Sequence, residues 1–318
     1  INKPYPKANF IINPKKNNGY IEYDYLCATS LTYFFLEMLE KKIRSKINLR
    51  KHLIYVLLAT VCDVMPLRKF NRLLSKIALK EFKISDNHVL NELYKLSNKK
   101  NKINIADLGY LIGPILNAGG RLGKSNFATE LLSTNDHKII NKKSLELINL
   151  NNKRKKIESN ILNDINFSKL ENDNEKIIIY NNLSINEGLI GIIASRLKDH
   201  FNKPSIVITN SNNILKGSAR SISNYNIGRT IKKLLDKNII LNGGGHNMAA
   251  GFSLKKENLL IFKKFINEDY KKNYSIRNNL FYYDAEVSSN VFNKDFYADI
   301  NKIGPFGNGN PLPIFFFK

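Results

Sequence analysis

The chain has 318 residues, of which 43% are hydrophobic and 24% charged, and this composition excludes a disordered or fibrous protein. The length predicts two domains, or three small ones. The longest apolar stretch, residues 53–62, has about half of the roughly 20 residues that a membrane-spanning helix needs. Two cysteines are too few for a disulfide framework, and no apolar signal segment opens the chain, so we expect a cytoplasmic protein with no membrane contact.

The net charge of +23 favours a polyanionic partner, above all nucleic acid, because neutralising phosphates releases condensed counterions. A second explanation is equally open. Forty of the fifty basic residues are lysine, and a strongly AT-biased genome would produce that excess without any selection for binding. The positions of the ten arginines are therefore more informative than the total charge.

The first part of the chain is predicted to be helical apart from one short strand over residues 10–12. Apolar residues recur at three- and four-residue steps over residues 25–42, and residues 51–62 form a second apolar helix that Pro66 ends. Asp63 then lies at a junction between helix and loop. More helix is expected over residues 71–96.

A glycine-punctuated segment follows over residues 107–123, and residues 137–166 read as one long polar helix. A helix of that length and polarity is typical of a connector between two compact regions. Buried strands at residues 176–180 and 204–209 flank a helix at 188–201, which predicts a βαβ unit.

Two further helices are expected, at residues 227–237 and 256–270, on either side of a glycine run. The last forty residues are expected to be β-rich. The chain stops at Phe315–Lys318, inside an apolar run, and we interpret the sequence as a fragment.

Two short motifs suggest phosphate contacts. In the first, Asn117–Arg121 (NAGGR), small residues allow a backbone to approach an anion, and arginine offers a planar fork of donors; a glycine turn with a surface arginine is the alternative. In the second, Ser218, Arg220 and Ser221 lie close together, and in a strand Ser218 and Arg220 would point the same way; an exposed polar strand is the alternative. Asn186 reads as the cap of the 188–201 helix.

The sharpest motif is NGGGHNMAAG at residues 242–251. Three consecutive glycines, Gly243, Gly244 and Gly245, have a high conformational entropy cost and make room for a ligand close to the backbone. His246 would then bond a phosphate oxygen or a base, although a single histidine often has only a structural role. Asp63 by itself is not a metal site, since two-metal phosphodiester chemistry needs several ligands.

Together these segments resemble the RecJ family of single-stranded-DNA-specific exonucleases within the DHH phosphoesterase superfamily. The resemblance rests on ordered segments along nearly the whole chain: FIINP at 10–14, ATVCDVMPL at 59–67, the 107–123 segment, EGLIGIIASRL at 187–197, GSARS at 217–221, GGGHNMAAGF at 243–252 and IGPFGNGNPLP at 303–313.

The resemblance implies an α/β fold with two α/β domains joined by a long helix, followed by the start of an OB-fold β-barrel. The implied limits are residues 1–137 for the C-terminal part of the DHH catalytic domain, 138–166 for the connecting helix, 167–273 for the DHH-associated substrate-binding domain, and 279–318 for the truncated OB fold.

The resemblance also implies a 5′-to-3′ exonuclease of DNA repair and recombination that hydrolyses phosphodiester bonds with two metal ions, Mn²⁺ or Mg²⁺, and releases 5′ mononucleotides. Asp63 would be a metal ligand and a catalytic residue. His246, which would line the DNA path beside the metals, would be a second catalytic residue. The substrate-binding residues would be Asn117, Arg121, Asn186, Ser218, Arg220, Ser221, Gly243, Gly244, Gly245 and His246. The partners would be single-stranded DNA with a 5′ end, a single-strand-binding protein and a helicase.

Two departures from the family pattern bear on activity. The DHH motif and the earlier aspartate motifs are absent, so most metal ligands would lie upstream and the 318 residues alone are expected to be inactive. Asn186 stands where many relatives carry a histidine, and an amide cannot be protonated there.

Two alternatives remain at this stage. One is a DHH-type phosphodiesterase for cyclic dinucleotides or short oligonucleotides, which the PFGNGNP segment disfavours. The other is a non-catalytic nucleic-acid-binding scaffold on the same fold, which the presence of Asp63, Arg121 and Arg220 disfavours.

Overall fold

The computed structural model describes residues 7–15, 22–44, 47–172, 176–274 and 282–317. Its contacts divide the chain into two compact units. Unit 1 comprises Ile1–Leu116, Leu131–Ser144 and Phe281–Lys318, and unit 2 comprises Asn117–Glu130 and Leu145–Leu280. The domain limits expected from the sequence stay a prediction.

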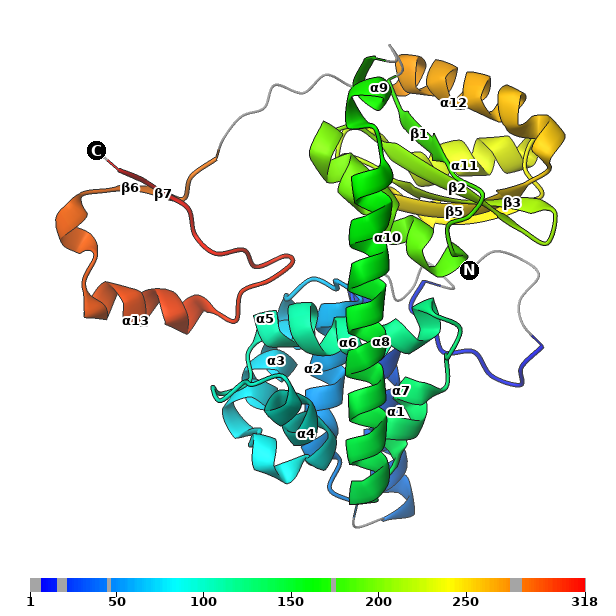
Figure 1. Ribbon diagram of the computed structural model, residues 1–318. Helices are drawn as coiled ribbons and strands as arrows, with labels where there is room; N and C mark the ends of the chain where they lie inside the picture. Colours follow the sequence, from blue (N-terminus) through cyan, green and yellow to red (C-terminus); the bar gives the residue numbers. More distant parts are fainter. Residues whose placement is uncertain (1–6, 16–21, 45–46, 173–175, 275–281, 318) are drawn as a thin grey trace. The chain divides into compact units, whose positions relative to one another are not determined.

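Unit 1 is mainly helical among the described residues (Figure 1). Its core includes three fully buried side chains: Leu57 of α2, Leu90 of α4 and Ile112 of η4. Its elements, some shared with unit 2, are α1 (Ala28–Ile43), η2 (Leu49–His52), α2 (Leu53–Cys62), α3 (Lys69–Glu81), η3 (Ile84–Asp86), α4 (His88–Leu96), α5 (Ile105–Asp107), the π-helical η4 (Leu108–Ile112), α6 (Gly113–Arg121), α7 (Phe127–Ser133), α8 (His137–Asp164), β6 (Ala285–Val287), η6 (Ser289–Val291), α13 (Lys294–Ile303) and β7 (Phe315–Phe317).

The early helices are confirmed, with a break between α3 and α4, but the expected strand at residues 10–12 is wrong. No described strand pairs with this segment, and Phe10 is 91% exposed, so neither a ladder nor a core holds it extended.

The glycine-rich segment is helical over residues 107–121, and only residues 122–123 form a turn. Its glycines allow close packing: a Cβ on Gly113 would lie 2.6 Å from Sγ of Cys62, and one on Gly119 would lie 2.5 Å from the carbonyl oxygen of Lys124. Arg121 is therefore the last residue of α6.

The C-terminal segment is only partly β-rich, because α13 occupies Lys294–Ile303. The side chain of Asn293 caps this helix by accepting the Phe296 N–H at 2.9 Å, a local signal that outweighs the apolar pattern. β6 and β7 pair in parallel. The described residues 282–317 form no closed barrel, so the start of an OB fold stays a prediction.

Unit 2 is built on a five-stranded sheet with the order β1-β2-β3-β5-β4. β1 and β2 are parallel and joined through α10, which confirms the βαβ unit, whereas the other pairs are antiparallel. Its elements are α9 (Phe167–Asn172), β1 (Ile178–Asn181), α10 (Glu187–Phe201), β2 (Ser205–Ser211), β3 (Ile214–Arg220), α11 (Ile227–Asp236), β4 (Asn242–His246), β5 (Ala249–Leu254), η5 (Lys256–Asn258) and α12 (Leu259–Asn273).

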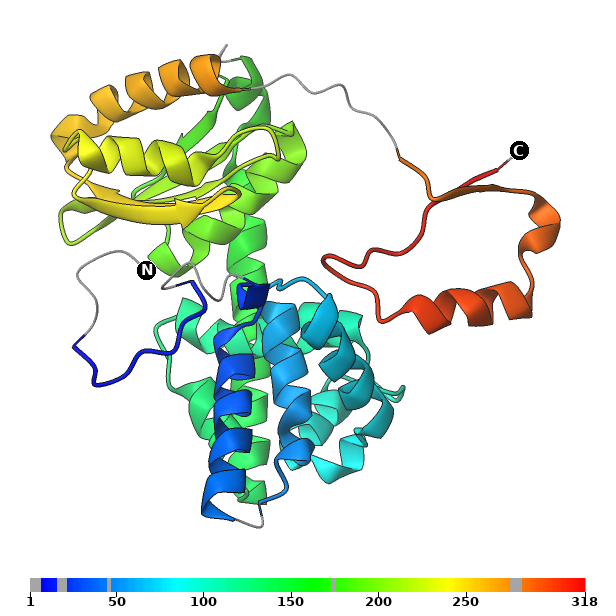
Figure 2. The same ribbon diagram turned by 180° about the vertical axis from the view of Figure 1, so that it is seen from behind.

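Helices cover both faces of this sheet (Figures 1 and 2). On one face α10 packs Leu189 and Ile193 against β1 and β2. On the other, α11 and α12 contribute Ile231 and Phe262 to a second core. The α10 face of β3, β5 and β4 is left with polar and small residues.

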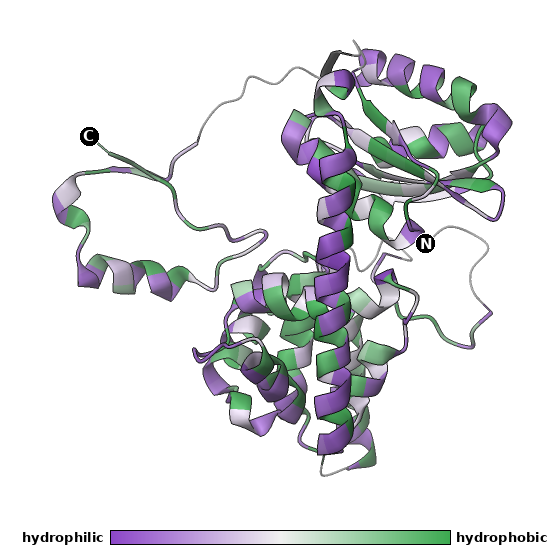
Figure 3. Cartoon of the chain, in the orientation of Figure 1, coloured by the Kyte–Doolittle hydropathy of each residue, from purple (hydrophilic) through white to green (hydrophobic). Residues whose placement is uncertain are grey.

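The long helix α8 is confirmed, with 28 residues. Figure 3 shows hydrophilic residues over most of its length. Its first eight residues, 137–144, belong to unit 1 and the remainder to unit 2. Its role as a connector between domains stays a prediction. The chain therefore has the mixed α/β class that the sequence predicted.

Candidate functional site

Register places predicted ligand-binding residues of β3 and β4 on one face of the sheet, with β5 between them. Arg220 in β3 pairs with Ala249 in β5, which pairs with His246 in β4. Residues opposite each other in antiparallel strands project from the same face. Because neighbouring strands lie about 4.8 Å apart, His246 and Arg220 are two strand steps, or roughly 10 Å, from each other along this face.

Every second residue of these strands extends the same face, which we call the open face. Ser218 precedes Arg220 by two residues, which confirms that they point the same way. The open face consists of Lys216, Ser218, Arg220, Asn242, Gly244, His246, Ala249, Gly251 and Ser253.

In the middle of the open face, glycines leave the backbone uncovered by side chains. A Cβ on Gly244 would meet nothing within 4 Å, and one on Gly251 would meet only the carbonyl oxygen of Gly217, at 3.9 Å. A hollow of about 580 Å³ lies here, and at its edge Lys216 pairs with Glu187 at 2.6 Å. The open face can therefore accept a flat or extended ligand close to the backbone.

The other two glycines of the GGGH motif point to the opposite face of the sheet, where neighbours lie close. A Cβ on Gly243 would lie 2.8 Å from Cγ2 of Ile231, and one on Gly245 would lie 2.5 Å from Cβ of Ala250. The motif thus combines close packing on one side with open space at Gly244 on the other. His246 is exposed, and its Nδ1 accepts the Met248 N–H at 3.3 Å.

Arg220 is half-buried at the edge of the open face beside α10. Its Nη1 donates to Oγ of Ser218 at 3.2 Å and to the carbonyl oxygen of Ala219 at 2.9 Å. The guanidinium lies over Gly191, where a Cβ would be 2.9 Å from Nη2. Burial lowers the pKa of Arg220, and the charge of Arg121 lowers it further.

Arg121 approaches the same end of α10. Its Nη1 donates to the Gly188 carbonyl oxygen at 3.3 Å, and its own carbonyl oxygen would lie 2.2 Å from a Cβ on Gly188. Burial lowers the pKa of Arg121, as does the charge of Arg154, while Glu158 acts in the opposite direction. Glycine at position 188 is thus required for this approach.

Neither Arg121 nor Arg220 forms an ion pair with a carboxylate anywhere in the described ranges. The two half-buried guanidinium groups repel each other, so positive charge gathers here, and the charge of Glu158 offsets it in part at Arg121. Guanidinium forks match the oxygens of phosphate, so an oxyanion between them would relieve the repulsion.

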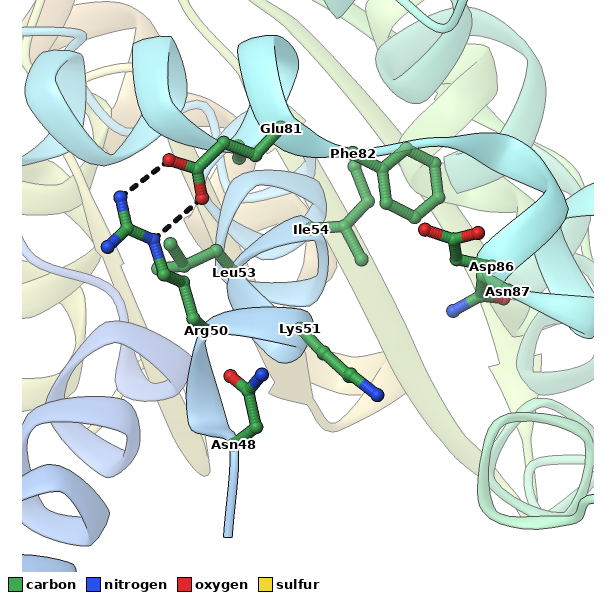
Figure 4. Close-up of a pocket in the computed structure, with 10 residues that line it drawn as sticks. Asn48, Arg50, Lys51, Leu53, Ile54, Glu81, Phe82, Asp86 and Asn87 are labelled. Atoms are coloured by element: carbon green, nitrogen blue, oxygen red, sulfur yellow. Dashed lines mark hydrogen bonds and ion pairs between the residues drawn. The ribbon is translucent and has the colours of Figure 1, made fainter.

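A pocket in unit 1 gives the contrasting case (Figure 4). It has a volume of about 260 Å³, and Arg50 donates there through Nε and Nη2 to the two carboxylate oxygens of Glu81 at 2.6 and 2.5 Å. That contact raises the pKa of Arg50 and lowers the pKa of Glu81. Arg50 is thus already neutralised, unlike Arg121 and Arg220.

Sequence reasoning missed an acidic residue behind the arginine pair. Glu158 of α8 is buried and accepts from Arg154 Nη1 at 3.0 Å and from Arg196 Nε at 2.8 Å, which ties α8 to α10. Arg154 also donates to Asn151 at 3.1 Å. The four-residue spacing of Arg154 and Glu158 was the available signal.

The remaining predicted residues of unit 2 occupy different environments. Asn117 is exposed one turn before Arg121, and Asn186 caps α10 by accepting the Gly188 N–H at 2.8 Å. Ser221 does not join the open face, because it is buried and donates to the Tyr225 carbonyl oxygen at 2.7 Å. The binding roles of all these residues stay predictions.

Asp63 belongs to unit 1, where it is exposed at the C-terminus of α2. The next residue, Val64, has φ of 54°, a left-handed conformation that costs a β-branched residue roughly 1–2 kcal/mol. The Met65 N–H closes the turn on the Thr60 carbonyl oxygen at 2.9 Å. No group of three or more His, Cys, Asp or Glu side chains suited to a metal occurs in the described part of the chain.

Asp63 alone therefore does not make up a two-metal site.

Among the described residues, no helix is long and apolar enough to cross a bilayer.

Comparisons with known proteins show what this chain is similar to. The DHHA1 domain family matches residues 174–272, which include the whole five-stranded sheet. The single-stranded-DNA-specific exonuclease RecJ of Haemophilus influenzae is 30% identical over 98% of this chain and 57% of its own length. The Bacillus subtilis protein of the same name is 30% identical over 80% of this chain and 33% of its own length.

Solved structures give the same fold. The crystal structure of Thermus thermophilus RecJ with Mn²⁺ matches with a TM-score of 0.79 and 23% identity over 91% of this chain and 43% of that chain. The Mg²⁺ complex matches with a TM-score of 0.75 over 90% of this chain and 44% of that one. The chain thus spans between 33% and 57% of the length of these relatives; over most of its own length it is homologous to RecJ proteins of the DHH superfamily.

Proposed function

We propose that this chain binds the 5′ end of single-stranded DNA and forms part of a 5′-to-3′ exonuclease of DNA repair and recombination that releases 5′ mononucleotides. The observation that carries the proposal is the pair Arg121 and Arg220, half-buried, mutually repelling and without a carboxylate partner in the described ranges. A terminal phosphate carries more charge than an internal phosphodiester and would gain most from this pair.

The open face supplies a path for the strand from that phosphate. The low surface at Gly244 and Gly251 admits a sugar or base, and His246, roughly 10 Å from Arg220, lies about one nucleotide further along. Asn186 and Asn117 would contribute amide contacts near the arginine pair. Anchoring at the terminal phosphate would set both the polarity and the register of cleavage.

We propose Mn²⁺ or Mg²⁺ as the metal, because the Thermus thermophilus structures contain these ions. The described residues offer Asp63 as a single carboxylate and do not fit a metal pair by themselves. The 318 residues alone are accordingly expected to bind DNA without cleaving it.

Further parts of the proposal concern the surroundings of this site. Residues 279–318 would begin an OB fold, 138–166 would connect the substrate-binding domain (167–273) to the catalytic part (1–137), and the protein would work in the cytoplasm. A single-strand-binding protein and a helicase are proposed partners, since a helicase produces single strands and a single-strand-binding protein binds them. The relatives' names support the DNA substrate alone.

The test compares the affinity of 5′-phosphorylated and 5′-hydroxyl oligonucleotides for Arg220→Ala and for Arg229→Ala. Arg229 is an exposed arginine of α11 in the same unit, so its replacement removes the same charge away from the pocket. Arg220→Ala should abolish the preference for the 5′-phosphorylated oligonucleotide, whereas Arg229→Ala should lower the affinity for both oligonucleotides equally. Loss of affinity for both oligonucleotides to the same extent in Arg220→Ala would remove the phosphate-binding role.

A further inference from the structure

The turn that carries Asp63 is held by a segment more than 230 residues later in the chain. The Leu67 N–H donates to the Asn308 carbonyl oxygen at 2.6 Å, and Nδ2 of Asn308 donates to the Val64 carbonyl oxygen at 2.5 Å. Asn308 thus bonds both ends of the turn that follows Asp63. Residues 303–310, which we call the strap, belong to unit 1 with this turn.

Two glycines bring the strap close to the turn. Gly309 has φ of 74°, and a Cβ there would lie 2.7 Å from Cβ of Pro66. A Cβ on Gly307 would lie 2.8 Å from Cδ1 of Leu67. A side chain at either position would displace the strap, so the close approach of the strap to the turn requires glycine at both.

Basic side chains of α3 fix the start of the strap, where α13 ends (orange in Figure 1). Nη2 of Arg72 donates to the Ile303 carbonyl oxygen at 2.6 Å, and Nζ of Lys76 donates to the Lys302 carbonyl oxygen at 3.1 Å. These cations lie at the C-terminal end of a helix, where positive charge is favourable. Within the strap, Asn310 donates to the Ile303 and Pro305 carbonyl oxygens at 3.1 and 2.9 Å.

We propose that the strap is a positioning segment for Asp63, and that Asn308 is its principal positioning residue. The left-handed Val64 needs neighbours that fix its conformation, and the bond from Asn308 to its carbonyl oxygen supplies one. The strap thereby sets where the Asp63 carboxylate points and does not itself contact the substrate. Its catalytic consequence rests on the proposed function, whereas its structural consequence does not.

Hydrogen exchange of the Leu67 amide in the 318-residue chain tests the structural consequence. Asn308→Ala removes one hydrogen bond and should speed this exchange about fivefold. Gly309→Ala should speed it at least as much. Leu312→Ala, at a side chain 63% exposed just beyond the strap, is the matched control and should leave it unchanged.

Exchange in α4, where Leu93 is fully buried, reports whether each variant still folds. If Gly309→Ala does not fold, Arg72→Ala tests the contact from the side of α3 and should also speed exchange at Leu67. Wild-type exchange at Leu67 in the folded Asn308→Ala and Arg72→Ala variants would overturn the proposal.

Kinetics of the full-length gene product test the catalytic consequence. Because Asn308 acts on Asp63 while the proposed DNA-binding residues belong to unit 2, Asn308→Ala should lower kcat about tenfold and change KM for single-stranded DNA less than twofold. An unchanged kcat would refute positioning of Asp63 by the strap. If the wild type cleaves no DNA, the proposed function fails, while the exchange result at Leu67 still decides whether the strap holds the turn.

Discussion

One added methyl group at Gly191 should separate folding from binding. A Cβ there would lie 2.9 Å from Nη2 of Arg220 and 3.1 Å from Oγ of Ser218. Both atoms are ends of side chains, so the guanidinium can move by a few tenths of an ångström without disturbing the sheet. Alanine in a helix interior is favoured over glycine by roughly 0.5–1 kcal/mol. The stability of Gly191→Ala should therefore be unchanged or slightly raised.

Binding should weaken in the same variant. A displaced Arg220 loses part of a charge-assisted contact with the 5′ phosphate, and such contacts are worth about 1.5–3 kcal/mol when complete. Losing about 1–2 kcal/mol corresponds to roughly 5- to 30-fold weaker binding. Fluorescence anisotropy with a labelled 5′-phosphorylated oligonucleotide measures this change, and thermal melting measures stability.

Gly120→Ala is the matched control, because it adds a methyl to a helix where nothing lies within 4 Å. It should stabilise its helix by no more than Gly191→Ala does, and any affinity loss it causes measures the effect of a methyl group beside Arg121 rather than at Arg220. If Gly191→Ala binds the 5′-phosphorylated strand as tightly as the wild type, Arg220 does not contact the phosphate in the way inferred.

Three further predictions follow from other parts of the chain. Asp63→Ala should abolish Mn²⁺-dependent cleavage by the full-length gene product and leave DNA binding unchanged; cleavage at the wild-type rate would remove Asp63 from the metal site. Gly217→Ala should destabilise unit 2 by about 2–3 kcal/mol in urea unfolding, because its Cβ would lie 2.1 Å from the Phe252 ring, and a wild-type midpoint would contradict this. Burial raises the pKa of the Cys62 thiol to about 11, so the thiol loses its proton at lower pH in the unfolded chain than in the folded one. The free energy of unfolding should therefore fall between pH 9 and 11, and less steeply in Cys62→Ala. Equal slopes of the free energy of unfolding against pH in the two proteins would refute this.

Local patterns predicted much of the fold. The long polar stretch of α8 and the two apolar runs around α10 correctly predicted one long helix and the βαβ unit, because each signal lies within one element. The period of two in a strand correctly placed Ser218 and Arg220 on one face. The helical NAGGR segment was missed because the close packing of Gly119 is against Lys124, Phe127 and Leu147, which lie outside the motif.

Which residues lie together in the site could not be predicted from the sequence, because this depends on the order of the strands in the sheet. His246 comes level with Arg220 only because β5 lies between β3 and β4, and no spacing in the sequence reveals that register. Likewise, Asn308 reaches Val64 across more than 240 residues. Ser221 shows the opposite error: adjacent to the right motif, it turns into the core.

The most direct test of the account is the affinity of the wild-type chain for one single-stranded oligonucleotide with and without its 5′ phosphate, measured at fixed salt. Two unpaired, half-buried arginines predict at least about tenfold tighter binding of the phosphorylated strand. Equal affinities would contradict a 5′-phosphate site at Arg121 and Arg220 and would leave only the diffuse attraction of a basic protein.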